Sequence, residues 1–204
     1  DEARVAGVIA PYGEKISIAG TNGPGLVVIS GERGTMEAVL AELTHGGVST
    51  NRLNVSHAFH SFLMEPMLTE FENAAKKVRY APPVIGLISN VTGDLIGEAV
   101  ADPAYWVRHV RQPVRFAEGI EAMHRNGCRV FVEIGPAPVL SGMGKQCLKD
   151  PGILWVPSLR QGREDWTEML RGLAALYVRG APVNWSGFDG EYSHRPVVMP
   201  TYPF

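Results

Sequence analysis

Two histidines three positions apart, His57 and His60, are the residues of this chain best suited to proton transfer. Phe59 lies between them, and a run with helical periodicity follows at 62–78. Histidine is the side chain whose ordinary pKa lies closest to neutral pH, so either ring is a candidate general base. From the residues alone an alternative stays open, in which both histidines are polar caps of the helix and Phe59 is a core residue.

The elements before these histidines follow the order helix, strand, strand, helix, strand. A glycine-rich turn at 22–25 predicts a hairpin between the first two strands, and Thr35 is the predicted cap of the second helix. This order predicts a ferredoxin-like unit without its first strand, so we expect the chain to begin inside a domain. The predicted elements are helices at 2–10 and 35–45 and strands at 16–19, 26–30 and 51–55.

After His60, apolar strands alternate with helices, a pattern typical of a parallel sheet covered on both faces. Pro66 is expected in the first helical turn, where a missing N–H costs little. From Ala181 onward the chain is rich in proline and aromatic residues, and we expect an extended segment. The predicted strands are 84–89, 129–134 and 153–156, and the helices are 62–78, 103–110, one opened by Pro113, 138–148 and 164–179.

Composition excludes several classes of function. With 45% hydrophobic residues and a formal net charge of −2, the chain is typical of a globular protein without the basic surface that nucleic acid or membrane binding needs. The absence of a long apolar run predicts a cytoplasmic protein. Cys128 and Cys147 lack metal-ligand spacing, so we expect no metal site and two buried free thiols.

Several motifs in order resemble the acyltransferase domain of modular type I polyketide synthases, over essentially the whole chain. They are Val55-Ser-His-Ala-Phe-His-Ser61, Leu87-Ile-Ser-Asn-Val-Thr-Gly93, the stretch from Tyr105 to Phe116, Val132-Glu-Ile-Gly-Pro136 and Met199-Pro-Thr-Tyr-Pro-Phe204. The resemblance implies an α/β fold, namely the C-terminal part of an α/β-hydrolase-like acyltransferase. It assigns 1–58 to an incomplete ferredoxin-like small subdomain, 59–160 to the large subdomain, and 161–204 to a helix and an extended linker towards a ketosynthase.

The resemblance also implies a ping-pong reaction. A serine in a GxSxG turn takes a malonyl unit from malonyl-CoA and passes it to the phosphopantetheine thiol of an acyl carrier protein, with no tightly bound cofactor. His60 matches the general base of the family, which a serine hydroxyl needs to become a good nucleophile. His109 matches the residue whose main-chain carbonyl orients that base, so its own side chain is expected to have only a packing or surface role.

The same resemblance assigns substrate choice to His57, Ala58 and Phe59, because His-Ala-Phe-His accompanies malonyl units and Tyr-Ala-Ser-His methylmalonyl units. The Phe59 ring is expected to fill the space of an α-methyl group. Ser61 and Asn90 are further pocket candidates. For His57 and Ser61, structural capping is the open alternative.

The chain departs from the family in one respect, since it contains no GxSxG. The nucleophilic serine is therefore expected upstream of Asp1, in an N-terminal half of the domain that would be a partner of this chain, and the chain alone is expected to be inactive. One alternative is a non-catalytic docking or scaffold module for the carrier protein or the ketosynthase. A malonyl transferase of fatty-acid synthesis is a second alternative, which the terminal Pro-Thr-Tyr-Pro-Phe disfavours.

Overall fold

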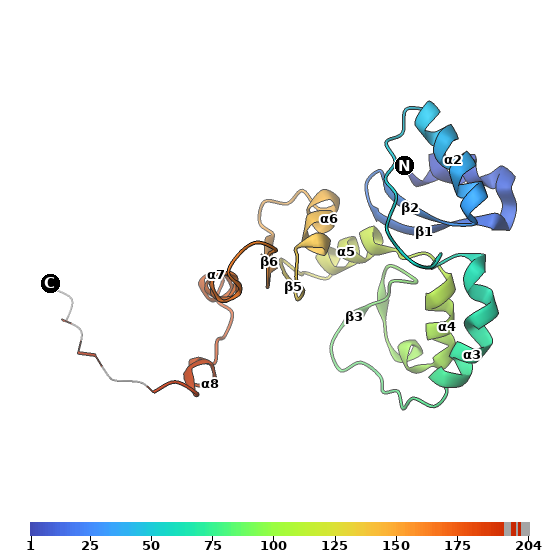
Figure 1. The fold of residues 1–204 in the computed structure, drawn as a ribbon. Helices are drawn as coiled ribbons and strands as arrows, with labels where there is room; N and C mark the ends of the chain where they lie inside the picture. Colours follow the sequence, from blue (N-terminus) through green and yellow to red (C-terminus); the bar gives the residue numbers. More distant parts are fainter. Residues whose placement is uncertain (194–196, 199, 201–204) are drawn as a thin grey trace.

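The computed structural model describes residues 1–193, 197, 198 and 200 and has an α/β fold. Its N-terminal part is an antiparallel hairpin of β1 (Ile16–Gly23) and β2 (Leu26–Gly31) with α2 (Arg33–His45) lying across it (Figure 1). The turn needs glycine, because Gly25 has a φ of 72°, which other residues rarely adopt. The remaining N-terminal elements are α1 (Glu2–Ile9) and η1 (Ala10–Lys15).

A small apolar core holds this part together. Ile16 on β1 packs with Val39 and Leu43, one turn apart on α2, and Val39 is fully buried. The N-cap position is Glu32 rather than Thr35, without a capping hydrogen bond from its side chain, and the Thr35 hydroxyl donates to the Glu32 carboxylate at 3.0 Å. The hairpin and both helices confirm the sequence prediction, whereas the prediction of Thr35 as the helix cap was wrong.

The strand expected at 51–55 does not form. Among the described residues no strand lies beside this segment, and Val55 donates its N–H to the carbonyl of Leu53 two positions earlier. A strand without a neighbour leaves its backbone groups unpaired, so local turns and solvent take them instead. The ferredoxin-like subdomain therefore stays a prediction.

The helices after His60 match the expected pattern more closely. The 3-10 helix η2 (Phe62–Met64) leads into α3 (Glu65–Ala75), with Pro66 in its first turn as predicted. Helix α3 lies beside α4 (Pro103–Arg111), and Arg111 pairs with Glu65 at 3.0 Å (Figure 1). This pairing of helices carries both chain segments that build the candidate site.

The strand expected at 84–89 is short and uncovered. Only β3 (Leu87–Ile88) is extended, and it pairs antiparallel with β4 (Leu95–Ile96). Val84 is 99% exposed and Ile85 is 79% exposed, so the prediction of a strand covered on both faces was wrong for the described chain. The 3-10 helix η3 (Glu98–Ala101) follows.

The one parallel pair among the described strands is β5 (Val130–Glu133) with β6 (Leu154–Pro157), where the Phe131 and Trp155 rings stack at 4.4 Å. The pairing confirms the expected strand direction. The expected burial is wrong, because Val130 and Val132 are 38% and 47% exposed on one face. Helices α6 (Val139–Cys147) and α7 (Asp165–Val178) contact the pair, and α5 (Phe116–Arg125) packs against α6.

The C-terminal part contains α8 (Trp185–Asp189) where an extended segment was expected, capped by the Asn184 side chain. The expected extended run at 196–204 lies mostly outside the described residues. Both cysteines are free, but Cys128 is exposed and Cys147 is half-buried, so the prediction of buried thiols was wrong. No helix in the described ranges is long and apolar enough to cross a membrane.

Candidate functional site

The imidazole of His60 is held by a main-chain carbonyl. Its Nδ1 lies 2.7 Å from the carbonyl oxygen of Gln112, which can only accept a hydrogen bond. Nδ1 therefore carries the proton, and in the neutral ring Nε2 keeps its lone pair. The half-buried ring is thus oriented with a basic nitrogen available for a substrate or a nucleophile.

His60 has an unusual backbone conformation. Its φ of 62° makes it the one described non-glycine residue in the left-handed region. This conformation costs roughly 1–2 kcal/mol for a residue with a side chain. Residues held in such conformations are frequent at functional sites, where the surrounding contacts impose them.

Ser61 supplies part of that restraint. Its side chain is fully buried, and its hydroxyl donates to the carbonyl of Ala58 at 2.7 Å and accepts from the N–H of Leu63 at 3.3 Å. These bonds close the turn before η2 and cap that helix. Between the two alternatives for Ser61, the contacts favour structural capping over a place in the pocket.

The carbonyl that binds His60 belongs to Gln112 and not to His109, so that assignment is corrected. Helix α4 ends at Arg111, and Gln112 is extended with a ψ of 152°. Pro113 explains this geometry, because the residue before a proline is forced out of the helical region. The carbonyl of Gln112 consequently leaves the helix direction and reaches His60. The Gln112-Pro113 pair was the sequence signal that could have identified it.

His109 contributes its ring instead. The centroid of its ring lies 6.4 Å from that of His60, in an edge-to-face arrangement. It lies 6.0 Å from the ring centroid of Tyr105 and 5.9 Å from that of Trp106. Burial, and secondly the nearby His60, lower the pKa of His109 below its ordinary value. The lowered pKa favours the neutral form of this ring beside the candidate base, and a packing role for the His109 side chain stays the expectation.

The residues expected to select substrate lie immediately before the base. The Phe59 side chain is 50% exposed, and its ring lies 5.8 Å from that of His57. The His57 Nδ1 is 2.9 Å from the Ser56 hydroxyl, and Ala58 provides the carbonyl that Ser61 binds. Much of the Phe59 ring is therefore free to contact a ligand.

Asn90 contributes through its backbone. Its carbonyl accepts the N–H of Arg115 at 2.8 Å, which ties the loop after β3 to the segment that carries Gln112. The preceding Ser89 is buried and hydrogen-bonds the Tyr105 hydroxyl at 2.9 Å. Asn90 is exposed, so its side chain remains a candidate for ligand contact.

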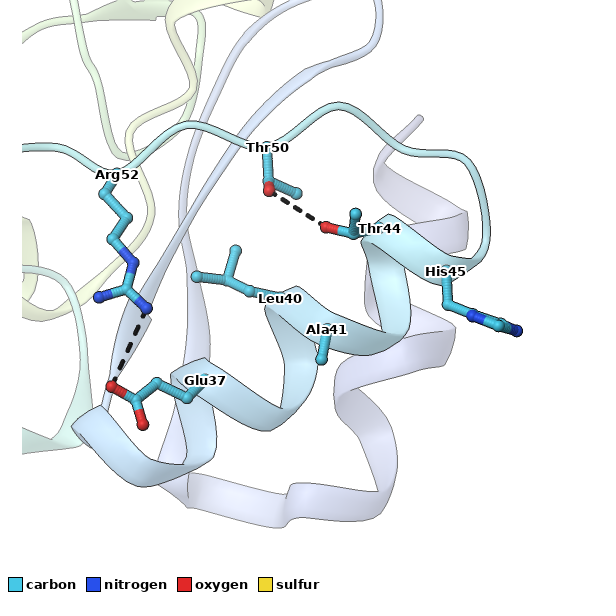
Figure 2. Close-up of a pocket in the computed structure, with 7 residues that line it drawn as sticks. All are labelled: Glu37, Leu40, Ala41, Thr44, His45, Thr50 and Arg52. Carbon is cyan, nitrogen blue, oxygen red and sulfur yellow. Dashed lines mark hydrogen bonds and ion pairs between the residues drawn. The ribbon is translucent and has the colours of Figure 1, made fainter.

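Two surface depressions lie apart from these residues. One, of about 770 Å³, lies over α2, where Arg52 pairs with Glu37 at 3.9 Å and Thr50 contacts Thr44 at 3.4 Å (Figure 2). The other, of about 710 Å³, lies between the loop before α6, β6 and α7. Neither is lined by His60 or its neighbours. In the part of the chain that the structure covers, no three metal-ligating side chains gather.

Comparisons with known proteins identify the family of this chain. The family described as the acyl transferase domain matches residues 5–182. The spectinabilin polyketide synthase system protein NorB of Streptomyces orinoci is 40% identical over 208 residues, across 100% of this chain and 10% of that protein. Polyketide synthase GfsA of Streptomyces halstedii is 39% identical over 93% of this chain and 3% of its own length.

Solved structures that resemble this chain include acyltransferases. The acyltransferase domain from the second module of the salinomycin polyketide synthase has a TM-score of 0.92 and 41% identity, over 100% of this chain and 48% of that one. The malonyl CoA-acyl carrier protein transacylase of Clostridium perfringens has a TM-score of 0.77 and 26% identity, over 89% and 57%. The chain thus spans about half of these domains and a tenth or less of those two synthases. It belongs to the acyl transferase domain family, and the relatives described above include polyketide synthases and their acyltransferase domains.

Proposed function

We propose that this chain is the C-terminal part of a polyketide synthase acyltransferase domain that transfers malonyl units, with His60 as its general base and acid. One observation carries the proposal, namely the 2.7 Å contact between the His60 Nδ1 and the carbonyl of Gln112. That contact fixes both the tautomer and the direction of the ring, which are the two properties that a base needs.

In the proposed reaction, His60 uses its free Nε2. Nε2 of His60 removes the proton of a serine hydroxyl, and the serine oxygen forms a bond to the thioester carbon of malonyl-CoA. The carbon–sulfur bond then breaks, and the imidazolium returns the proton to the departing thiolate. The phosphopantetheine thiol of the carrier protein reverses the sequence when it takes the malonyl group from serine.

The serine belongs to a part of the domain outside this chain. The uncovered apolar surface near β5 supports this division, since Val130, Val132 and Ile134 are 38%, 47% and 85% exposed. Parallel strands are normally covered on both faces. The remaining half of the domain would cover this surface and bring its serine to His60, so we expect the present chain alone to be inactive.

The exposed ring of Phe59 supports malonyl as the substrate, because it occupies the selective position of the His-Ala-Phe-His signature. One structural relative is titled a malonyl CoA-acyl carrier protein transacylase, which agrees with malonyl-CoA as donor and a carrier protein as acceptor. We propose the segment 161–204 as the connection towards a ketosynthase.

The test is acylation of the acyltransferase polypeptide that contains this chain. After mixing with malonyl-CoA, intact-mass measurement should show one malonyl adduct, and His60→Ala should slow its formation by about 10²–10⁴-fold, the usual contribution of a general base. His45→Ala is the matched control, because His45 lies on α2 at a surface depression that His60 does not line (Figure 2). Equal rates in His60→Ala and the parent would refute the role of His60. A parent polypeptide that binds carrier protein without forming an adduct would favour a docking module.

A further inference from the structure

Strand β1 forms main-chain hydrogen bonds to the segment that carries the Gln112 carbonyl. The N–H of Val114 donates to the carbonyl of Ala19 at 2.9 Å, and the N–H of Thr21 donates to the carbonyl of Val114 at 2.9 Å. Val114 and Gly20 thus form a parallel bridge between the hairpin and the connection from α4 to α5, which passes beside β1 (Figure 1). Val114 is only two residues from Gln112, so this bridge fixes the chain close to the base.

Two further hydrogen bonds complete the restraint. The N–H of Arg115 donates to the carbonyl of Asn90 at 2.8 Å, and the N–H of Gln112 donates to the carbonyl of Arg108 at 2.7 Å. Gln112 is therefore anchored to α4 on one side and to β1 and the loop after β3 on the other. The rotation of its carbonyl depends on where these anchors lie.

The approach of β1 to Val114 depends on a missing side chain. A Cβ added to Gly20 would lie 3.2 Å from the carbonyl oxygen of Val114 and 3.4 Å from its Cβ. Contacts this tight force a neighbour to move by a few tenths of an ångström. Gly20 is flanked by Ala19 and Thr21, whose backbone groups make the two bonds, so any side chain there pushes directly on the bridge.

We propose that Gly20 is a positioning residue for His60, because its lack of a side chain lets β1 hold the Gln112 carbonyl where it orients the imidazole. This inference rests on the proposed role of His60 as base. Gly20 touches no reacting atom. It acts through Val114 and the main chain of Gln112, and it links the N-terminal hairpin to the geometry of the candidate active site.

The expected effect is moderate. A displacement of about 1 Å at a catalytic group costs about 100-fold in rate, so a shift of about 0.3 Å corresponds to about fourfold. We expect Gly20→Ala to lower kcat for malonyl transfer by about fourfold and to leave KM for malonyl-CoA unchanged, because the bridge affects the orientation of the base and not the binding of the thioester. The larger side chain of Gly20→Val should lower kcat further.

Gly23 supplies the matched control. It lies on the same strand, but a Cβ there would meet its nearest atom, the Sγ of Cys147, at an ordinary 3.7 Å. Gly23→Ala should therefore retain kcat. Val114→Ala is a second control, since it removes methyl groups and keeps both main-chain bonds. If Val114→Ala lost as much kcat as Gly20→Ala, side-chain packing would explain the effect and the proposal would be overturned.

The kinetic test compares these variants in the acyltransferase polypeptide that contains this chain, below their melting temperatures. In a His60→Ala background, Gly20→Ala should have no further effect on the residual rate, because the base that it positions is gone. A fourfold loss that persists in this background, or equal kcat in Gly20→Ala and Gly23→Ala, overturns the inference. If His60→Ala alone retains full activity, the proposed function fails instead, so the two failures are distinguishable.

A measurement on the unaltered polypeptide keeps the inference testable if Gly20→Ala does not fold. Hydrogen exchange should protect the amides of Thr21 and Val114 to the same degree, because both open when the bridge opens. Exchange of Val114 many times faster than that of Thr21 would show that β1 does not hold this segment, and would overturn the proposal.

Discussion

Replacing Phe59 with serine should change which extender unit the site accepts. Half of the Phe59 side chain is exposed and its ring lies 5.8 Å from that of His57, so the ring can contact the α-carbon substituent of a substrate. An α-methyl group on the substrate that contacts this ring should weaken binding of the transition state by about 1–3 kcal/mol, the usual range for one methyl group in an apolar pocket. We expect the lower part of that range, about 1.4 kcal/mol or tenfold, because an exposed ring yields more easily than a buried one.

The assay is competition between malonyl-CoA and methylmalonyl-CoA for the polypeptide that contains this chain, with the two acyl adducts separated by mass. Phe59→Ser should reduce the malonyl preference by about tenfold and leave malonyl turnover within a factor of about two to three, because no bond to His60 is lost. Phe59→Leu keeps an apolar side chain of intermediate size, so its malonyl preference should lie between those of the parent and Phe59→Ser. An unchanged ratio in Phe59→Ser would refute the steric explanation of selectivity.

Three further variants test contacts that stabilise the fold, two of them beside His60. Ser61→Ala leaves the carbonyl of Ala58 without its partner, and should lower the free energy of unfolding by about 1–3 kcal/mol in urea titrations, whereas the exposed Ser56→Ala should not. Desolvation raises the pKa of Glu133, but hydrogen bonds from Ser141 and Leu140 outweigh it and leave the pKa below its ordinary value. The folded state therefore favours the carboxylate that caps α6, and Glu133→Gln should cost about 0.5–2 kcal/mol near neutral pH and show little difference from the parent in acid. The pKa of His109 is lowered by burial and by His60, so the unfolded chain binds more protons, and the free energy of unfolding should fall as the pH drops below the ordinary value of 6.5. His109→Phe should weaken this pH dependence, and an unchanged slope in urea titrations across that range would contradict it.

The helices were largely predictable from sequence because their signals are local. Periodic apolar residues predicted α2 and α7, and Pro66 and Pro103 marked the first turns of α3 and α4. The strands were less predictable, because pairing depends on what lies beside a segment. Residues 51–55 were predicted to be a strand but have no neighbouring strand in the described chain, and the apolar run at 84–89 forms only a short hairpin.

In the candidate site too, the local signal was predictable from sequence and the contact that depends on backbone geometry was not. His60 was identified from its type and motif, but the carbonyl that orients it was placed three residues too early, at His109. The helix end at Arg111 and the following proline decide which carbonyl is free, and this depends on backbone geometry rather than on residue type. The bridge between Gly20 and Val114 joins segments that are distant in sequence, so no local pattern could predict it.

The most direct test is nitrogen-15 NMR spectroscopy of the His60 ring in the acyltransferase polypeptide that contains this chain. In the neutral ring we expect the proton on Nδ1, held by the carbonyl of Gln112, and an unprotonated Nε2 that can act as the base. A neutral ring with its proton on Nε2 would contradict the assignment of His60 as the base.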